Sequence, residues 1–329
     1  MSDFVKVSNL VKNYGNICAV DNLSVTVKEG EIFGLLGPNG AGKSTTINIL
    51  TMLSDYDKGT VTISGLDSVK DREKIKQLIG VVPQDIALHP FLTALENVCF
   101  FASLYGLKGK ELKAAARRAL KFVGLSEKEN LRMNKMSGGM KRRLNIACGI
   151  AHSPKLIVMD EPTVGVDTQS RDLILHSIQV LRQEGATVIY TSHYMQEVEE
   201  ICDRIAIIDK GHLIACGTEQ ELVELVTDRK QYDTEVTLPE GFDKSLFFKE
   251  LLLLPDIKDA TISDKNGKTC LKIETNLGFH DLMQLMVLLM KYKIQLDTMA
   301  SHVPSLDSMF LTLTGHDMQT ENNENNKSR

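Results

Sequence analysis

The chain lacks the patterns that mark disulfide-bonded, membrane-spanning and strongly basic proteins. Its six cysteines are scattered and form no C-x-x-C pair, so we expect reduced, mostly buried thiols. No apolar run approaches the ~18 residues that a membrane-spanning helix needs, and the first residues form no apolar signal region. The formal net charge of −5 gives no overall attraction to nucleic acid or to an anionic membrane, so no nucleic-acid partner is expected. Any role at a membrane is therefore expected to depend on a partner protein.

The composition is otherwise that of a globular protein with ample core material. Of 329 residues, 43% are hydrophobic and 25% are charged, and this length predicts one large domain or two smaller ones. A local basic run, Lys141-Arg142-Arg143, is expected to be a solvated helix face.

A glycine-rich segment at residues 37–45 matches the phosphate-binding loop G-x-x-x-x-G-K-S/T. The apolar run 32–36 predicts a buried strand before it, and residues 46–50 can continue as a helix after it. In that context backbone N–H groups and the positive end of the helix point at one anion. Lys43 can then reach the β- and γ-phosphates of a nucleotide, and the Ser44 hydroxyl can bind Mg²⁺. A chance match in a glycine-rich turn is the alternative, expected roughly once in a hundred chains of this length. The predicted nucleotide-binding residues of this loop are Gly37, Pro38, Asn39, Gly40, Ala41, Gly42, Lys43, Ser44 and Thr45.

Residues 1–226 alternate short apolar runs with amphipathic segments, which predicts an α/β layered core. The later apolar runs are nearly continuous, as expected for strands that are covered on both faces. Residues 93–151 lack strand signals and carry helix-forming runs, so we expect an inserted helical subdomain there. The expected strands are 5–7, 23–27, 32–36, 60–63, 80–82, 156–160, 187–191, 204–209 and 212–216.

The pattern changes after residue 226. Residues 230–315 follow the order strand, helix, strand, strand, helix, strand, which predicts a small α+β accessory domain of the ferredoxin-like kind. A stripe of Met and Leu at 282–290 is expected to be part of its core rather than a binding surface. Residues 316–329 are polar and are expected to form a disordered tail.

Two adjacent carboxylates follow a second apolar run, 156–159. Asp160 and Glu161 should emerge together at the C-terminal end of that strand, where α/β sheets bind ligands. Asp160 can hold Mg²⁺, and Glu161 can act as the general base for a water that attacks the γ-phosphorus. The alternative is that Asp160 and Glu161 are simply two acidic residues at the start of a surface loop. That interpretation would be the better one if the chain had no phosphate-binding loop.

A second candidate anion site begins at residue 137. Ser137, Gly138 and Gly139 precede a helix-forming run, which is typical of an ordinary helix N-cap. The exposed backbone of such a helix start can also bind an anion. Because the chain already contains one phosphate site, a composite nucleotide site between two copies becomes plausible.

These motifs, in this order and spacing, resemble those of the ATP-binding subunit of an ABC transporter. The resemblance covers about residues 1–226, and it includes Gln84, Asp167 and His193, which stand where that family has them. Three fuller stretches, 137–147, 161–171 and 191–197, resemble the branch that powers ABC-2-type exporters, including drug and antibiotic efflux systems. The C-terminal segment, which ends in residues 304–310, resembles the accessory domain of that branch. One departure is Met140, because the family signature has Gln at that place.

The resemblance implies a role for each site residue. Tyr14 would stack on adenine, although an ordinary loop aromatic is the alternative. Gln84 would contact Mg²⁺ and the attacking water, and His193 would donate to the γ-phosphate, although a lone histidine is more often structural. The expected catalytic residues are Glu161, His193, Gln84 and Lys43, and the expected Mg²⁺ ligands are Ser44, Gln84 and Asp160.

The resemblance also implies a dimer. Ser137, Gly138 and Gly139 would contact the γ-phosphate held by the opposite protomer, and Asp167 would lie across the interface. ATP and Mg²⁺ would be the ligands, and the partners would be a second copy or a paralogous subunit together with a separate transmembrane permease that selects the cargo. The protein would be cytoplasmic and peripheral on the inner face of the membrane. Three alternatives stay open: a soluble mechanical ABC ATPase acting on ribosomes or DNA, a phosphate-loop kinase, and the ATPase of an importer.

Overall fold

The protein divides into two compact units in the computed structural model. The structure describes residues 2–192, 194–226, 229–239, 241–254, 257–265, 268–276, 282–302 and 306–314. The boundary between them falls after Glu219, and the smaller unit spans Gln220–Gly315. Helix α8 (Glu219–Val226) therefore goes mainly with the smaller unit, whereas the expected boundary lay after residue 226. Within these ranges, no helix is both long and apolar enough to cross a membrane.

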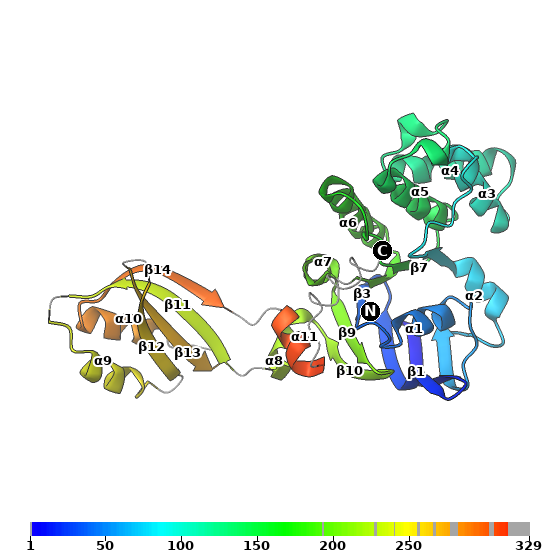
Figure 1. The fold of residues 1–329 in the computed structure, drawn as a ribbon. Helices are drawn as coiled ribbons and strands as arrows, with labels where there is room; N and C mark the ends of the chain where they lie inside the picture. The colour runs from blue at the N-terminus through cyan, green and yellow to red at the C-terminus, as the bar shows by residue number, and fades with distance from the viewer. Residues whose placement is uncertain are drawn as a thin grey trace. The chain divides into compact units, whose positions relative to one another are not determined.

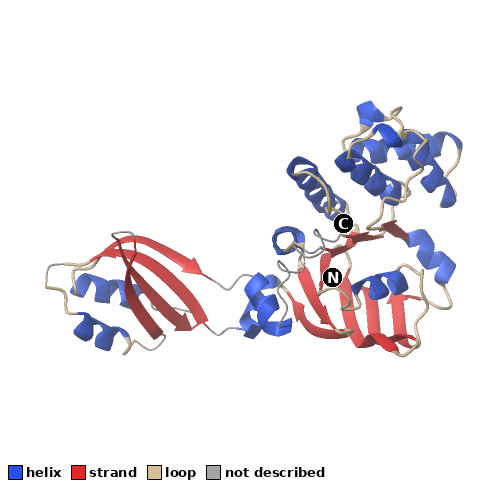
Figure 2. Cartoon of the chain, in the orientation of Figure 1, coloured by secondary structure: helices blue, strands red, loops and turns tan. Residues whose placement is uncertain are grey.

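Two sheets build the larger unit (Figures 1 and 2). One is antiparallel with the order β2-β1-β4-β5, and the other has the order β10-β9-β3-β8-β7-β6 and is parallel apart from its β9–β10 hairpin. Apolar side chains from both sheets, among them Val5, Val61, Phe33 and Ile189, share one core. The strands are β1 (Asp3–Tyr14), β2 (Ile17–Lys28), β3 (Ile32–Leu36), β4 (Lys58–Ile63), β5 (Leu66–Asp67), β6 (Ile79–Val82), β7 (Leu156–Asp160), β8 (Thr187–Thr191), β9 (Arg204–Asp209) and β10 (His212–Gly217).

The strands of the parallel sheet are apolar because helices and the second sheet shield them from water. Every residue of β3 and β8 is buried, as expected for strands covered on both faces. All the expected strands are present, but β1 and β2 are longer than expected and the two-residue strand β5 was not predicted. The helices beside these strands are α1 (Lys43–Leu50), α2 (Arg72–Leu78), α6 (Thr168–Gln183) and α7 (Met195–Ile201).

Three helices fall within the expected helical insert, 93–151, and Figure 1 draws them as one group. The first has a complete capping box, in which the Thr93 hydroxyl accepts from the Glu96 N–H and the Glu96 carboxylate accepts from the Thr93 N–H. The helices are α3 (Ala94–Leu104), α4 (Gly109–Phe122) and α5 (Gly138–Ile150), with short 3₁₀ turns η1 (Ser126–Lys128) and η2 (Met133–Lys135) before α5.

The smaller unit contains a four-stranded antiparallel sheet with the order β12-β13-β11-β14. With one helix after the first strand and another before the last, this is the ferredoxin-like arrangement. Leu285, Leu288 and Leu289 of the Met and Leu stripe lie in its core, whereas Val287 and Met290 are exposed. The expected disordered tail, 316–329, lies outside the described residues. The elements are β11 (Arg229–Thr237), α9 (Lys244–Leu251), β12 (Ile257–Lys265), β13 (Lys268–Asn276), α10 (Leu282–Lys291), β14 (Gln295–His302) and α11 (Leu306–Thr314).

Candidate functional site

The glycine-rich loop joins the end of β3 to the start of α1, and two of its glycines are required by close backbone approaches. A Cβ on Gly37 would lie 2.2 Å from the Ile208 carbonyl oxygen, and one on Gly42 would lie 2.4 Å from the Ala19 carbonyl oxygen. Gly42 also has φ of +102°, which side-chain-bearing residues rarely adopt. The loop conformation therefore depends on glycine at these two positions.

Lys43 lies buried across this loop. Its Nζ donates to the carbonyl oxygens of Gly37 at 2.6 Å and Pro38 at 3.0 Å, so the ammonium group is held against the loop backbone. A positive charge beside a helix N-terminus is suited to a phosphate group. In the rest of the loop, Pro38 and Ala41 are buried, Gly42 and Thr45 are half-buried, and Asn39, Gly40 and Ser44 are exposed.

Asp160 and Glu161 emerge at the end of β7, and Gln84 reaches them from the loop after β6. The Gln84 Nε2 donates to Glu161 Oε2 at 2.6 Å. Thr191, at the end of β8, donates its hydroxyl to Asp160 Oδ1 at 2.7 Å and accepts from the Glu161 N–H at 2.9 Å. Glu161 has φ of +47°, a left-handed conformation that is uncommon for a residue other than glycine. Three of the four residues expected at the metal and the attacking water, Gln84, Asp160 and Glu161, therefore lie together.

Arg142 is a site residue that the sequence analysis missed. Only 3% of it is exposed, so the expectation that Lys141-Arg142-Arg143 forms a solvated helix face is wrong for its central residue. Burial lowers the pKa of Arg142, and the nearby carboxylates, first among them Glu161, act in the opposite direction. The guanidinium group donates to four backbone carbonyls, those of Pro83, Gln84, Glu161 and Pro162.

Glu197 on α7 was also missed, and it forms a second buried network beside the same segment. It is fully buried, and its Oε2 accepts hydrogen bonds from the hydroxyls of Thr163 at 2.8 Å, Tyr190 at 2.7 Å and Ser192 at 2.6 Å. Its Oε1 accepts from the Arg171 Nε at 2.8 Å. Burial, followed by the negative charge of Glu197, raises the pKa of Tyr190 well above its ordinary value. A run of acids in a helix gives no sign in the sequence that one of them is buried.

The second candidate anion site lies where α5 and α6 begin side by side. Ser137 is the N-cap of α5, and its Oγ accepts from the Met140 N–H at 3.3 Å. A Cβ on Gly139 would lie 2.2 Å from the Ser170 Oγ. Asp167 is the N-cap of α6, and hydrogen bonds from the Ser170 N–H and hydroxyl lower the pKa of its carboxyl group. Gly139 is therefore needed for the close approach of the two helix starts, whether or not an anion binds there.

Of the two remaining predicted residues, Tyr14 and His193, the structure describes only Tyr14. Tyr14 ends β1 at the β1–β2 hairpin and is 49% exposed, with the Lys12 Nζ 5.2 Å from its ring centroid. An exposed aromatic face of this kind is available for stacking. His193 lies outside the described residues.

Comparisons with known proteins decide the family. A family model described as ABC transporter matches residues 20–164. The linearmycin resistance ATP-binding protein of Bacillus subtilis is 42% identical to the chain over 96% of this chain and 99% of its own length. The chain belongs to the ATP-binding subunits of ABC transporters. As a member of this family it is an ATPase.

Further relatives of this ABC subunit agree with that assignment. The Nod factor export ATP-binding protein I of Paraburkholderia xenovorans is 34% identical over 96% of this chain and 98% of its own. A solved structure of an ATP-binding subunit of an ABC transporter has a TM-score of 0.62 and 26% identity, and covers 68% of this chain and 92% of its own. A dimeric ATP-binding cassette in a post-hydrolysis state with ADP and Pi has a TM-score of 0.60 and 30% identity, and covers 65% of this chain and 98% of its own.

The donor set of this ABC subunit fits Mg²⁺. Among the described residues no three His, Cys, Asp or Glu side chains gather into a group that could hold a metal alone. Ser44 supplies a hydroxyl, Asp160 a carboxylate and Gln84 an amide, all of them oxygen donors. Mg²⁺ commonly takes one or two protein oxygens and fills its remaining positions with water and substrate phosphates. The residues therefore suit a metal that arrives with a nucleotide.

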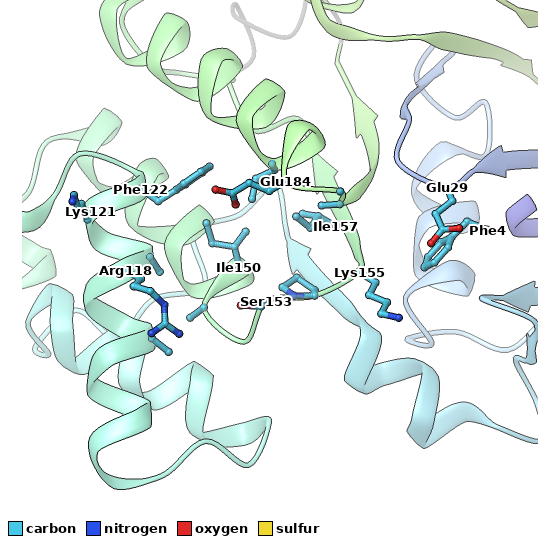
Figure 3. A pocket seen from close by; sticks show the side chains of 17 residues that line it. Phe4, Glu29, Arg118, Lys121, Phe122, Ile150, Ser153, Lys155, Ile157 and Glu184 are labelled. Carbon is cyan, nitrogen blue, oxygen red and sulfur yellow. The ribbon is translucent and has the colours of Figure 1, made fainter. Parts of the chain in front are cut away.

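This ABC subunit contains a cavity of about 690 Å³ (Figure 3). Lys155 and Ile157 line it at the start of β7, with Glu184 from the end of α6 and with Arg118 and Phe122 from α4. In a parallel sheet the strand starts and the strand ends lie at opposite edges. The phosphate loop follows the end of β3, so this cavity is not the phosphate site.

Proposed function

We propose that this chain is the ATP-hydrolysing subunit of a membrane exporter. Two copies, or this chain and a paralogous subunit, close head to tail over two ATP–Mg²⁺, and the motion drives a separate permease at the inner face of the membrane. The contact between Gln84 and Glu161 at the end of β7 is the observation that carries the proposal, because it joins a candidate base to a candidate water-positioning amide. The names of full-length relatives, which refer to linearmycin resistance and to Nod factor export, support the export direction.

We propose that the site residues divide the chemistry among them. Lys43 neutralises the phosphates, and the Glu161 carboxylate takes a proton from the attacking water while Gln84 orients that water. Mg²⁺ held by Ser44, Gln84 and Asp160 would neutralise charge on the β- and γ-phosphates. By the family resemblance, Tyr14 would stack on adenine and His193 would donate to the γ-phosphate.

The dimer supplies the remaining half of each site. Ser137 caps α5, and Gly138 and Gly139 are its first residues, whose backbone N–H groups have no partner within the helix. In the closed dimer these residues contact the γ-phosphate held by the partner. Asp167 lies close to them at the start of α6, so it faces the same interface. One chain contains each half of the site once, and neither half is sufficient without a partner.

Glu161→Gln tests the hydrolytic half of the proposal. Loss of a general base lowers the rate by about 10²–10⁴-fold, while ATP binding should persist. The variant should therefore accumulate as an ATP-bound dimer in size-exclusion chromatography. Near-normal hydrolysis would remove Glu161 from the role of base.

Crosslinking tests the head-to-tail dimer. The variant carries Ser137→Cys and Asn39→Cys, with the exposed Cys18 replaced by serine. An intermolecular disulfide that forms only with ATP, and that Lys43→Ala abolishes, is expected; each single cysteine serves as a control. A bond within one chain, or one indifferent to ATP, would favour a monomeric phosphate-loop enzyme instead.

Isolation from native membranes tests the partner. We expect the chain to copurify with a membrane permease, and the reconstituted pair to extrude cargo from the side that binds ATP. Copurification with ribosomes or DNA and no membrane protein would favour a mechanical ATPase, and transport in the opposite direction would favour an importer.

A further inference from the structure

We infer that Arg142 is a positioning residue for ATP hydrolysis, which holds the backbone of Glu161 and of Gln84 in one fixed arrangement and connects both to the helix that begins at Ser137. The inference rests on the roles proposed above for Glu161 and Gln84. It adds a residue whose side chain donates, among the described residues, only to backbone carbonyls and that acts through Glu161 and Gln84.

The first argument is the pattern of hydrogen bonds. The Arg142 Nε donates to the Pro162 carbonyl at 2.9 Å, and its Nη2 donates to the Glu161 carbonyl. Its Nη1 donates to the carbonyls of Pro83 at 2.9 Å and Gln84 at 2.7 Å. One guanidinium group thus bridges the loop after β6 and the loop after β7. The Gln84–Glu161 side-chain contact lies directly between those two loops.

The second argument is backbone strain. Glu161 has φ of +47°, and a left-handed residue other than glycine persists only where its surroundings fix it. The Glu161 N–H is bound by Thr191, and its carbonyl is bound by Arg142. Both backbone groups of the residue are therefore held, which fixes the direction of its Cα–Cβ bond, and the carboxylate at the end of the side chain is bound by Gln84.

The third argument is the residue type. The guanidinium group has five donors in a planar fork and keeps its charge when buried, whereas a lysine offers one compact ammonium group. Only a planar group with several donors can reach four carbonyls in two different loops. Asn145, one turn further along α5, adds a bond from its Nδ2 to the Pro83 carbonyl at 3.2 Å, so the same helix face is attached to the loop after β6.

A consequence follows for the dimer. Arg142 lies about one and a half turns after Ser137, the N-cap of α5, so a movement of the start of α5 is passed to the carbonyls of Glu161 and Gln84. In the proposed dimer Ser137 serves the ATP held by the partner, while Glu161 serves the ATP of its own chain. Arg142 thus connects one half-site to the other within a single protomer.

The test uses Arg142→Gln and Arg142→Lys in the full chain, with Arg143→Gln as the matched control. Arg143 is the next residue of the same helix and donates to the Val123 carbonyl, away from both loops. A displacement of about 1 Å can cost about 10²-fold in rate, so we expect this loss of kcat for Arg142→Gln, and an intermediate loss for Arg142→Lys. The KM for ATP should change little, and Arg143→Gln should behave as the unaltered protein.

A combination with Glu161→Gln separates positioning from a purely structural role. If Arg142 acts through Glu161, adding Arg142→Lys to Glu161→Gln lowers the residual rate much less than it lowers the rate of the unaltered protein. Three results would each overturn the inference. The first is a double variant in which the two rate losses multiply in full. The others are a raised KM with unchanged kcat for the Arg142 variants, and an equal kcat for the Arg142 and Arg143 variants. Arg142→Lys keeps the charge and carries the test if Arg142→Gln fails to fold. Full turnover by Glu161→Gln alone would contradict the proposed base, which is a different result from full turnover by Arg142→Lys.

Discussion

Replacing Glu197 with glutamine should destabilise the larger unit through a change of charge and donors at nearly constant shape. The carboxylate is buried and accepts all of its hydrogen bonds from side chains: three hydroxyls on Oε2 and the Arg171 Nε on Oε1. In Glu197→Gln the amide NH₂ must face one of these two sets. If it faces Arg171, two donors oppose one another; if it faces the hydroxyls, those groups lose their shared acceptor.

The magnitude follows from the strength of these bonds. Hydrogen bonds to a charged group contribute about 1.5–3 kcal/mol each, and breaking a fully buried ion pair costs about 3–5 kcal/mol. The Arg171 side chain is 29% exposed, so water offsets part of its loss. We therefore expect a loss of about 3 kcal/mol. At 2–4 °C per kcal/mol for a unit of this size, Tm should fall by about 6–12 °C.

Thermal unfolding by circular dichroism or calorimetry measures this shift. Glu200→Gln is the control, because Glu200 lies on the same helix, is exposed and undergoes the same change of charge. Its Tm should stay within about 1 °C of the unaltered protein. An equal Tm for Glu197→Gln and Glu200→Gln would refute the reasoning, since it would mean that the buried network contributes nothing.

Three further predictions concern the nucleotide site and the helix start. Lys43→Ala should weaken ATP binding roughly 10–100-fold, because a charge-assisted phosphate contact is lost; unchanged affinity in calorimetry would contradict the phosphate-loop assignment. Tyr14→Ala should weaken ATP binding by a factor of roughly 5–100 through lost stacking, whereas Tyr14→Phe should retain it, and equal affinities would exclude stacking. Gly139→Ala should lower the free energy of unfolding by about 1–3 kcal/mol in denaturant titration, because its Cβ meets Ser170. Gly138→Ala is the control, since its nearest non-neighbouring atom is 3.8 Å from a Cβ, and equal losses would argue against the clash.

The parallel sheet was the most predictable part of the fold. The strands β3, β7, β8 and β9 have the bounds that their apolar runs predicted. Each run is continuous because both faces of the sheet are covered, so burial leaves a clear mark in the sequence. The strand β5 has two residues and pairs at an edge, and so short a segment carries no periodic signal.

The candidate site was predictable where chemistry restricts the residue type. Glycines at 37 and 42 and the acids at 160 and 161 follow from backbone approach and from metal and proton chemistry. Arg142 was not predictable in this way, because a basic residue in a helix is typical of a solvated face. Its burial depends on two loops, far apart in the sequence, whose carbonyls meet beside α5, and no local pattern records that meeting.

The segment that carries Glu161 is thus held from two sides by charges of opposite sign. Arg142 binds the carbonyls of Glu161 and Pro162, while Glu197 binds the hydroxyl of Thr163. The two groups do not pair with each other. Arg142 donates to backbone carbonyls, and Glu197 accepts from three hydroxyls and from Arg171. Hydrogen bonds of this kind are strong in a buried environment and costly to leave incomplete. They fix three consecutive residues more tightly than packing alone would, and a left-handed glutamate at the end of β7 needs that support. The two networks that sequence reasoning missed are therefore the ones that hold the residue it found.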